Sequence, residues 1–279
     1  MKLTRIAVAA VASGAALGLA ACGGGTSGGG AGGSTGGGGG ETVKVGIKFD
    51  QPGLGLKEGS KYSGFDVDVA NYVAKELGVT PQFVEAVSSQ RESLIASGQV
   101  KYIVGTYSIT DTRKEKVSFA GPYFIAGQDL LVRADDTSIT GPDSLKDKKL
   151  CSVKGSTSAV NLQKKVPGVN LQEYNTYSLC VAALKAGNVD AMTTDDTILA
   201  GYAAQTQNQG KLKLVGKPFS TENYGVGLKK GDQAFCDQVT AALKKFISSG
   251  EWEKSVQKNL GPANYKPGPG NPPTPTCQL

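Results

Sequence analysis

Residues 43–87, VKVGIKFDQPGLGLKEGSKYSGFDVDVANYVAKELGVTPQFVEAV, contain the two hydrophobic periodicities that decide the fold class. Apolar and polar residues alternate over residues 43–49, which is typical of a strand. Apolar residues between 69 and 77 recur at helical spacing, and the acidic residues just before them favour a helix start. Residues 82–87 indicate a second strand. The stretch is therefore a strand–helix–strand unit, which predicts an α/β fold.

The same alternation continues along the chain and occurs a second time. Residues 91–96 indicate a helix and residues 102–106 a third strand, which completes a βαβαβ unit with a parallel sheet. A second series alternates strands and helices in the same order, at residues 149–153, 158–165, 171–174, 178–186 and 190–193. We therefore predict two α/β units built on the same plan.

A short echo links the two series. IASGQV at residues 95–100 resembles LKAGNV at residues 184–189, and each leads into a predicted strand. A further strand at residues 224–228 and two helices within residues 233–260 indicate that the first domain takes back the chain after the second is complete. Ligands of open α/β sheets bind at the carboxyl ends of the strands, so two facing domains predict a cleft for a small molecule.

The N-terminal residues indicate export. Lys2 and Arg5 precede an apolar run over residues 6–19, which is too short to remain as a membrane span. LAAC at residues 19–22 resembles a bacterial lipobox, and this resemblance implies cleavage before Cys22 and acylation of that cysteine. A plain secretory signal is the alternative. Residues 23–40 contain only Gly, Ser, Thr and one Ala, and they predict a flexible tether with a reach of roughly 20–25 Å.

Composition excludes several classes of function. The chain has no histidine, so the usual zinc sites and histidine-based catalysis are not available, and we predict no metal, no cofactor and no catalytic residues. The formal net charge of +6 comes from basic residues scattered among acidic ones, which gives no footprint for nucleic acid.

Four cysteines remain after Cys22, and an even number in an oxidising compartment favours two disulfides with three possible pairings. We favour Cys151 with Cys180, because both fall in the second domain. The other pair would then be Cys236 with Cys277, which would fix the Pro-rich tail to a helix.

Several ordered motifs resemble one family. GFDVDV at residues 64–69, SITDTR at 108–113, GPY at 121–123 and GST at 155–157 occur in the order and spacing of the family 3 extracellular solute-binding proteins, the polar amino-acid receptors of ABC importers. The similarity covers about residues 42–260. Within the family, residues 48–55 and 89–92 look most like the glutamate-binding lipoproteins of actinobacteria.

The resemblance implies a two-lobed, periplasmic-binding-protein-like fold of type II, with the ligand in the cleft between the lobes. We assign a signal peptide to residues 1–21 and the lipidated cysteine and tether to 22–40. Lobe 1 would comprise residues 41–133 and 222–264, lobe 2 residues 134–221, and the tail residues 265–279. The resemblance also implies a monomer whose partner is an ABC permease. We expect the protein to be anchored at the outer face of the cell membrane of a Gram-positive actinobacterium.

The resemblance also implies how an amino-acid zwitterion is held. Arg113 would bind the α-carboxylate, because its planar fork can make two parallel hydrogen bonds. The Ser108 hydroxyl and the backbone amides of Ser156 and Thr157 would be further donors, the last two at a predicted helix start. Asp195 would bind the ammonium, together with the carbonyl of Thr106. Singly, Arg113 could equally be a surface charge and Asp195 an ordinary helix cap. Asp66 and Asp68 are interpreted as helix-start residues.

Specificity depends on what meets the ligand's side chain. By the resemblance, Lys48 and Arg91 face that end of the pocket, and two cations there select an anion such as L-glutamate. An edge-strand lysine and a helix-surface arginine are the alternatives. Glutamate over aspartate rests on the resemblance, and glutamine is the nearest neutral competitor. A dehydratase-type enzyme with Glu92 or Asp50 as general acid, and a sensory module, are the other functions open on this fold.

Overall fold

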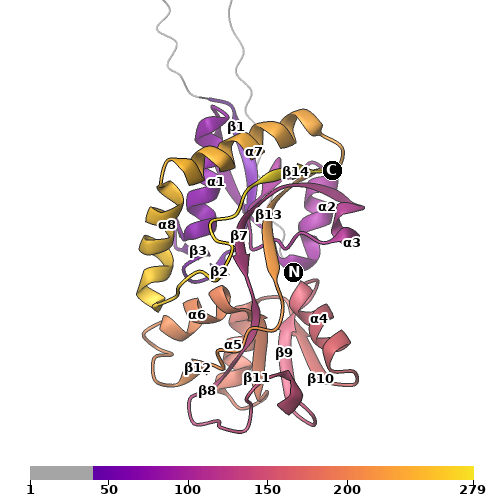
Figure 1. Cartoon of the computed structure of the whole chain (residues 1–279), viewed down its shortest axis with the longest axis vertical. Helices are drawn as coiled ribbons and strands as arrows, with labels where there is room; N and C mark the ends of the chain where they lie inside the picture. Colours follow the sequence, from indigo (N-terminus) through magenta and orange to yellow (C-terminus); the bar gives the residue numbers. More distant parts are fainter. Residues whose placement is uncertain (1–39) are drawn as a thin grey trace, which may run out of the picture. The chain divides into compact units, whose positions relative to one another are not determined.

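The computed structural model describes residues 40–279, and Figure 1 shows their helices and strands. The predicted signal peptide, Cys22 and all but the last residue of the predicted tether lie outside the described residues. No helix among the residues described is both long and apolar enough to cross a membrane.

The first lobe is built on a six-stranded mixed sheet in the order β14-β7-β13-β6-β1-β5. Its strands are β1 (Thr42–Ile47), β5 (Thr80–Glu85), β6 (Tyr102–Ile103), β7 (Val117–Ala126), β13 (Glu222–Lys229) and β14 (Thr276–Gln278). β5 and β6 pair with β1 in parallel, as the βαβαβ pattern predicts. β13 and β14 pair with β7 in antiparallel fashion.

The first lobe also contains the helices α1 (Phe65–Glu76), η1 (Ser88–Gln90), α2 (Arg91–Ala96), α3 (Asp111–Lys114), α7 (Gln233–Ser248), α8 (Glu251–Leu260) and η3 (Gly261–Ala263). Of these, α1, α2, α7 and α8 bury apolar residues in the core. A small antiparallel sheet of β2 (Asp50–Gln51), β3 (Gly55–Glu58) and β4 (Lys61–Ser63) lies between β1 and α1 in the sequence. Phe65 at the start of α1 packs among Phe124, Phe246 and Trp252, so the predicted helix start is also a core anchor.

The second lobe is a five-stranded sheet in the order β10-β9-β11-β8-β12. Its strands are β8 (Gln128–Arg133), β9 (Lys149–Val153), β10 (Asn170–Tyr174), β11 (Ala191–Asp195) and β12 (Leu212–Leu214). Its helices are η2 (Pro142–Ser144), α4 (Thr157–Lys165), α5 (Tyr177–Lys185) and α6 (Asp196–Ala204). β9, β10 and β11 are parallel, in agreement with the predicted second series.

One segment differs from the sequence expectation, and a second adds structure for which the sequence gives no expectation. β8 ends at Arg133, the residue assigned as the last of the first stretch of lobe 1, but it pairs with β11 and β12 in the second sheet. The chain thus enters the second sheet directly after β7, because the strand continues past Gly127 with little interruption. The tail also contributes regular structure, since β14 adds an edge strand to the first sheet.

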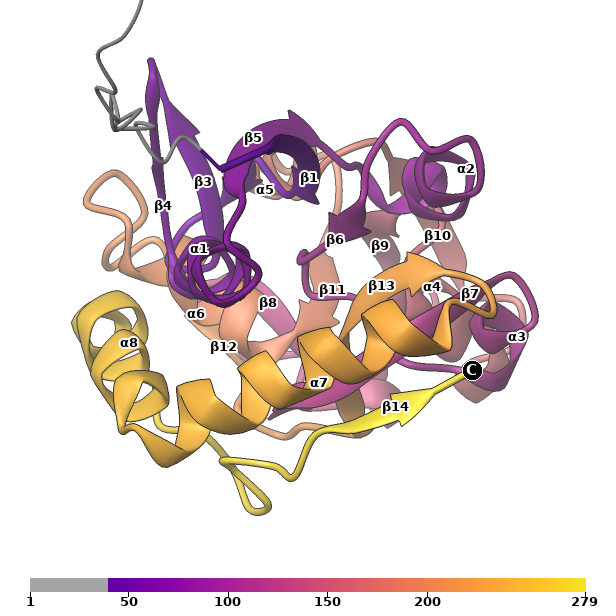
Figure 2. The same cartoon turned by 90° about the horizontal axis from the view of Figure 1, so that it is seen from above.

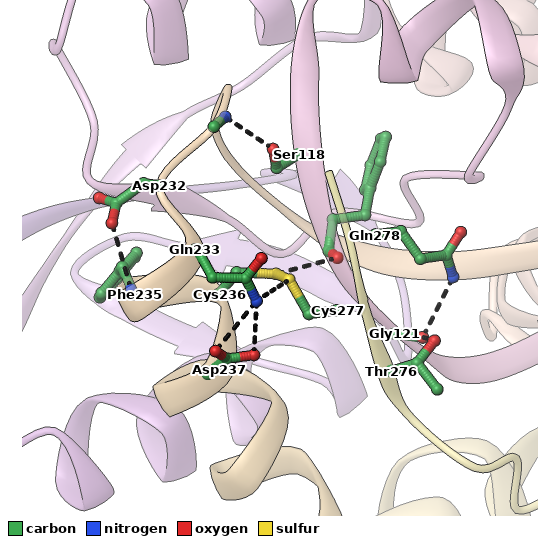
Figure 3. The surroundings of a disulfide bond; sticks show 12 residues. Ser118, Gly121, Asp232, Gln233, Phe235, Cys236, Asp237, Thr276, Cys277 and Gln278 are labelled. Carbon is green, nitrogen blue, oxygen red and sulfur yellow. Dashed lines mark hydrogen bonds between the residues drawn. A yellow bond between two sulfur atoms is a disulfide. The ribbon is translucent and has the colours of Figure 1, made fainter.

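Both favoured disulfides are present. Cys151 on β9 is bonded to Cys180 on α5, and Cys236 on α7 is bonded to Cys277 on β14. Figure 2 shows α7 crossing the first sheet with β14 running beside it, and Figure 3 shows the second bond in detail. Cys236 also lies beside β7, with its Sγ 3.4 Å from the carbonyl oxygen of Phe119. The bond therefore ties the end of the tail to a helix of the first lobe.

Candidate functional site

The predicted ligand-binding residues lie at or just beyond strand ends. Lys48 directly follows β1, Thr106 and Ser108 follow β6, and Asp195 is the last residue of β11. Seven of the eight are buried and Thr157 is half-buried; the full set is Lys48, Arg91, Thr106, Ser108, Arg113, Ser156, Thr157 and Asp195. Their burial argues against the alternative that Lys48, Arg91 and Arg113 are ordinary surface cations.

The loop after β6 holds Thr106 in an unusual backbone conformation. Thr106 has a φ of 44°, in the region that side chains rarely adopt. Its N–H donates a 2.8 Å hydrogen bond to Asp66 Oδ2, while Tyr123 donates its hydroxyl to Asp66 Oδ1, also at 2.8 Å. The Gln51 amide lies 3.2 Å from the Thr106 hydroxyl. Asp66 is thus more than a helix-start residue, because it fixes the loop that carries Thr106.

Asp66 is fully buried, and desolvation raises its pKa to about 6, although the hydrogen bonds from Tyr123 and Thr106 oppose the shift. Neither Gln51 nor Tyr123 was identified from the sequence as part of the site. Gln51 is separated from Thr106 by 55 positions in the sequence, and Tyr123 is separated from Asp66 by 57 positions. No local sequence pattern predicts contacts over such separations.

Lys48 and Arg91 are two buried cations. Lys48 is 3% exposed and its Nζ donates to Ser88 Oγ at 2.7 Å. Arg91 is 2% exposed; its Nη1 donates to the carbonyl of Gly105 at 3.0 Å, and its guanidinium lies 4.0 Å from the centre of the Tyr107 ring. Within residues 40–279 neither cation forms an ion pair, and Arg91 Nε has no hydrogen-bond partner.

The electrostatics of this pair favour an anion beside it. Burial, followed by the charge of Arg91, lowers the pKa of Lys48 well below its ordinary value. A carboxylate placed against both side chains would reverse this effect, since an opposite charge favours the charged form of lysine.

Arg113 connects the two lobes. The hydroxyl of Thr110 caps α3 by accepting the N–H of Arg113, which fixes the start of the side chain. Its guanidinium donates to the carbonyl of Ser108 at 2.8 Å and to the carbonyl of Gly155 in the second lobe at 2.9 Å. The Ser108 hydroxyl lies 3.3 Å from the hydroxyl of Thr157. Burial lowers the pKa of Arg113 to about 10, so it remains cationic at neutral pH.

Ser156 and Thr157 lie where the sequence places them, at the start of α4. The side chain of Ser156 caps the helix by accepting the N–H of Ala159, and its own N–H donates to the carbonyl of Val153 at 3.1 Å. The predicted use of the Ser156 amide by a ligand would thus compete with this bond. The hydroxyl of Thr157 faces Ser108 directly.

Asp195 is held by side chains that the sequence analysis missed. Tyr224 on β13 donates its hydroxyl to Asp195 Oδ2 at 2.6 Å, and Ser158 Oγ lies 3.4 Å from Oδ1. The carboxylate makes no capping bond to α6, so it does not take the role of an ordinary helix cap. Burial, followed by the negative charge of Glu222, raises the pKa of Asp195 well above its usual range.

The structure brings most of the predicted residues into one connected cluster. Arg91 and Arg113 lie against the same Tyr107 ring, and Arg113, Ser108 and Thr157 form a continuous set of contacts. Asp195 contacts none of the other predicted residues by hydrogen bond, but Tyr177 lies near it. Burial, followed by the charge of Asp195, raises the pKa of Tyr177 to about 12, and hydrogen bonds with Thr194 and Ser156 oppose the shift.

A site with a fixed guanidinium on one lobe and a buried carboxylate at the other lobe's strand end suits a zwitterion. The profile of the bacterial extracellular solute-binding proteins, family 3, matches residues 43–262. The chain belongs to this family. The fold of this solute-binding protein is accordingly the two-lobed α/β fold of type II.

This solute-binding protein is similar to two named relatives and to one solved structure. The glutamate-binding protein GluB of Corynebacterium glutamicum is 47% identical, over 79% of each chain. The ABC transporter glutamine-binding protein GlnH of Bacillus subtilis is 37% identical, over 78% of this chain and 81% of the relative. The solved structure of an ancestral arginine-binding protein bound to glutamine has a TM-score of 0.74 and 34% identity, and covers 79% of this chain and 98% of its own.

Proposed function

We propose that this solute-binding protein captures L-glutamate between its lobes and delivers it to an ABC permease. The observation that carries the proposal is the pair of buried cations Lys48 and Arg91, which have no carboxylate partner within residues 40–279. Leaving one buried charge unpaired costs about 3–5 kcal/mol, equivalent to roughly 10²–10⁴-fold in affinity. The side-chain carboxylate of glutamate would supply the missing anion.

The remaining ligand groups have matching partners. Arg113 would bind the α-carboxylate with the hydroxyls of Ser108 and Thr157, which already lie together across the two lobes. Asp195 would bind the ammonium, with the carbonyl of Thr106. Because residues of both lobes contact one ligand, binding would shift an open–closed equilibrium toward the closed form.

The place of action is the outer face of the cell membrane. The lipobox-like sequence before Cys22 and the Gly-rich stretch after it support a monomeric receptor that is anchored by acyl chains. Similarity to a protein named as the glutamine-binding protein of an ABC transporter supports the permease as partner.

Glutamine is the second candidate ligand, since one relative is named for it and one related structure contains it. The two cations argue against it, because its neutral amide would leave both charges buried without an anion. Aspartate satisfies the charge requirement but is shorter by one methylene. GluB, named for glutamate, supports the longer side chain.

Calorimetric titration of the purified protein with L-glutamate, L-aspartate, L-glutamine and L-arginine tests the proposal. We expect one-to-one binding of glutamate, with glutamine weaker by about a hundredfold or more. A preference for glutamine or arginine would refute the role of Lys48 and Arg91. Mass analysis of the incubated ligand should return glutamate unchanged, whereas a changed product would indicate an enzyme.

A further inference from the structure

Helix α5 of the second lobe is capped by a residue of the first lobe. Thr176, at the N-cap position, makes no side-chain capping bond, and its hydroxyl lies 2.9 Å from the hydroxyl of Ser178 instead. The N–H of Ser178 donates at 3.1 Å to Oδ2 of Asp50 on β2, 128 residues earlier in the chain. A carboxylate is a favourable acceptor at a helix N-terminus, because the free N–H groups and the helix dipole both favour negative charge.

A second helix of the same lobe donates to the same aspartate. The hydroxyl of Tyr202 on α6 donates to the backbone oxygen of Asp50 and also lies 3.2 Å from its Oδ2. Burial, followed by the charge of Asp50, raises the pKa of Tyr202 well above its usual value, so the hydroxyl remains a donor at neutral pH. Asp50 thus accepts hydrogen bonds from two separate elements of the opposite lobe.

The backbones of the two lobes approach closely beside these bonds. A Cβ added at Gly201 on α6 would lie 2.0 Å from the carbonyl oxygen of Pro52, which follows β2. Glycine is therefore required at this position for the lobes to meet. The approach of Gly201 to Pro52 and the hydrogen bonds of Asp50 form one contact area between the lobes. This contact area consists of protein groups alone and does not include the ligand.

We propose that Asp50, Ser178 and Tyr202 form an interlobe latch, and that Asp50 determines ligand affinity by stabilising the closed form. This inference rests on the proposed function, in which the ligand binds by lobe closure. Opening would return the Ser178 N–H and the Tyr202 hydroxyl to water and remove the charge-assisted bonds. Because the latch favours only the closed form, it increases the competent fraction and hence the apparent affinity.

The test compares Asp50→Ala with the exposed control Glu58→Ala on the neighbouring strand β3. We expect Asp50→Ala to weaken glutamate binding about tenfold. The Ser178 amide should also exchange its hydrogen faster in this variant. Glu58→Ala should leave both unchanged. Equal affinity and exchange in Asp50→Ala and the wild type would overturn the proposal.

A second variant separates closure from helix stability. In Asp50→Ala/Thr176→Asp, the new aspartate can cap α5 from within its own lobe, so a purely structural defect would be repaired. The latch predicts that affinity remains about tenfold weaker in this double variant, because the link between the lobes is still missing. Recovery of wild-type affinity would show that Asp50 acts only as a cap and would overturn the proposal.

A third variant adds a methyl group on the second lobe, at Gly201 in the same contact area. Gly201→Ala should weaken glutamate binding and should reduce the compaction that small-angle scattering detects with saturating glutamate. If the wild type itself does not bind glutamate, the proposed function fails. The latch then stands if small-angle scattering shows the Asp50→Ala/Thr176→Asp variant to be less compact than the wild type in the same buffer, and it falls if the two are equally compact.

Discussion

The Nζ atom of Lys48 lies 2.7 Å from the hydroxyl oxygen of Ser88, and this neutral group is its only hydrogen-bond partner within residues 40–279. A buried ammonium beside a second cation, Arg91, is an unfavourable arrangement for an isolated protein. It becomes favourable when an anion binds between them. The specificity of the site therefore depends on two cations that form no ion pair within residues 40–279, although the charges of Asp50 and Glu85 oppose part of the shift of Lys48.

Replacing Lys48 should remove the preference for an acidic side chain. We expect Lys48→Gln to weaken glutamate binding by about a hundredfold and to change glutamine binding much less, because only the charged ligand loses an ion pair. Titration with both ligands measures the ratio. Lys44→Gln, an exposed position on β1, is the matched control and should leave the ratio unchanged.

Replacing Arg113 should affect every amino-acid ligand equally. Arg113→Lys loses the planar fork that contacts both Ser108 and Gly155, so the α-carboxylate should be held less well. We expect at least tenfold weaker binding of glutamate and glutamine, with their ratio preserved. A change confined to glutamate would place Arg113 at the side-chain end of the pocket and contradict its assigned role.

Asp195 should make glutamate binding dependent on pH. Its pKa is raised well above the usual range, and a bound ammonium would lower it, because the charge stabilises the carboxylate. Affinity should therefore fall as the pH drops below the raised pKa, and binding should release a proton. Titrations in buffers of different ionisation enthalpy measure that release, and Asp195→Asn should abolish it.

Asp66 should make folding stability depend on pH in the opposite sense to that of a carboxylate whose pKa is lowered in the folded protein. Its folded pKa of about 6 exceeds the ordinary value of 3.8, so the folded protein binds this proton more tightly than the unfolded chain. The stabilisation is fully present below about 3.8 and is lost as the pH rises through 6, a difference of about 3 kcal/mol. Urea denaturation between pH 4 and 7 should show this slope in the wild type. Asp66→Asn should show a smaller slope, because Asp195, whose pKa is also raised, keeps its own contribution, and an unchanged slope would refute the assignment.

The Cys236–Cys277 disulfide should stabilise the fold mainly through the unfolded chain. It joins residues 41 positions apart, and closing a loop of that length lowers the entropy of the unfolded state by an amount equivalent to about 4 kcal/mol. We expect Cys236→Ala/Cys277→Ala to lose about that much free energy of unfolding in denaturant titration. A loss below about 1 kcal/mol would show that β14 is held by its strand pairing alone.

The sequence predicts the repeating elements of this protein well, because their periodicity is local. The parallel strands β1, β5 and β6, the parallel strands β9, β10 and β11, and both disulfides agree with expectation. β14 and the pairing of β8 were missed, since strand partners far apart in the sequence leave no periodic signal. The tail also carries prolines, which usually indicate loops.

The candidate site was predicted by residue type, and its supporting contacts were not. The sequence marks Thr106 and Asp195, but it does not show that Asp66 fixes the first or that Tyr224 donates to the second. The sequence does not indicate the role of Asp50 between the lobes, because its contacts with Ser178 and Tyr202 join segments more than a hundred residues apart. Such contacts depend on how the two lobes meet.

A crystal structure of the protein with L-glutamate tests the central claim most directly. We expect the side-chain carboxylate to lie within hydrogen-bond distance of Lys48 Nζ and the Arg91 guanidinium, with the α-carboxylate on Arg113 and the ammonium on Asp195. A glutamate whose side-chain carboxylate points away from both Lys48 and Arg91 would contradict it.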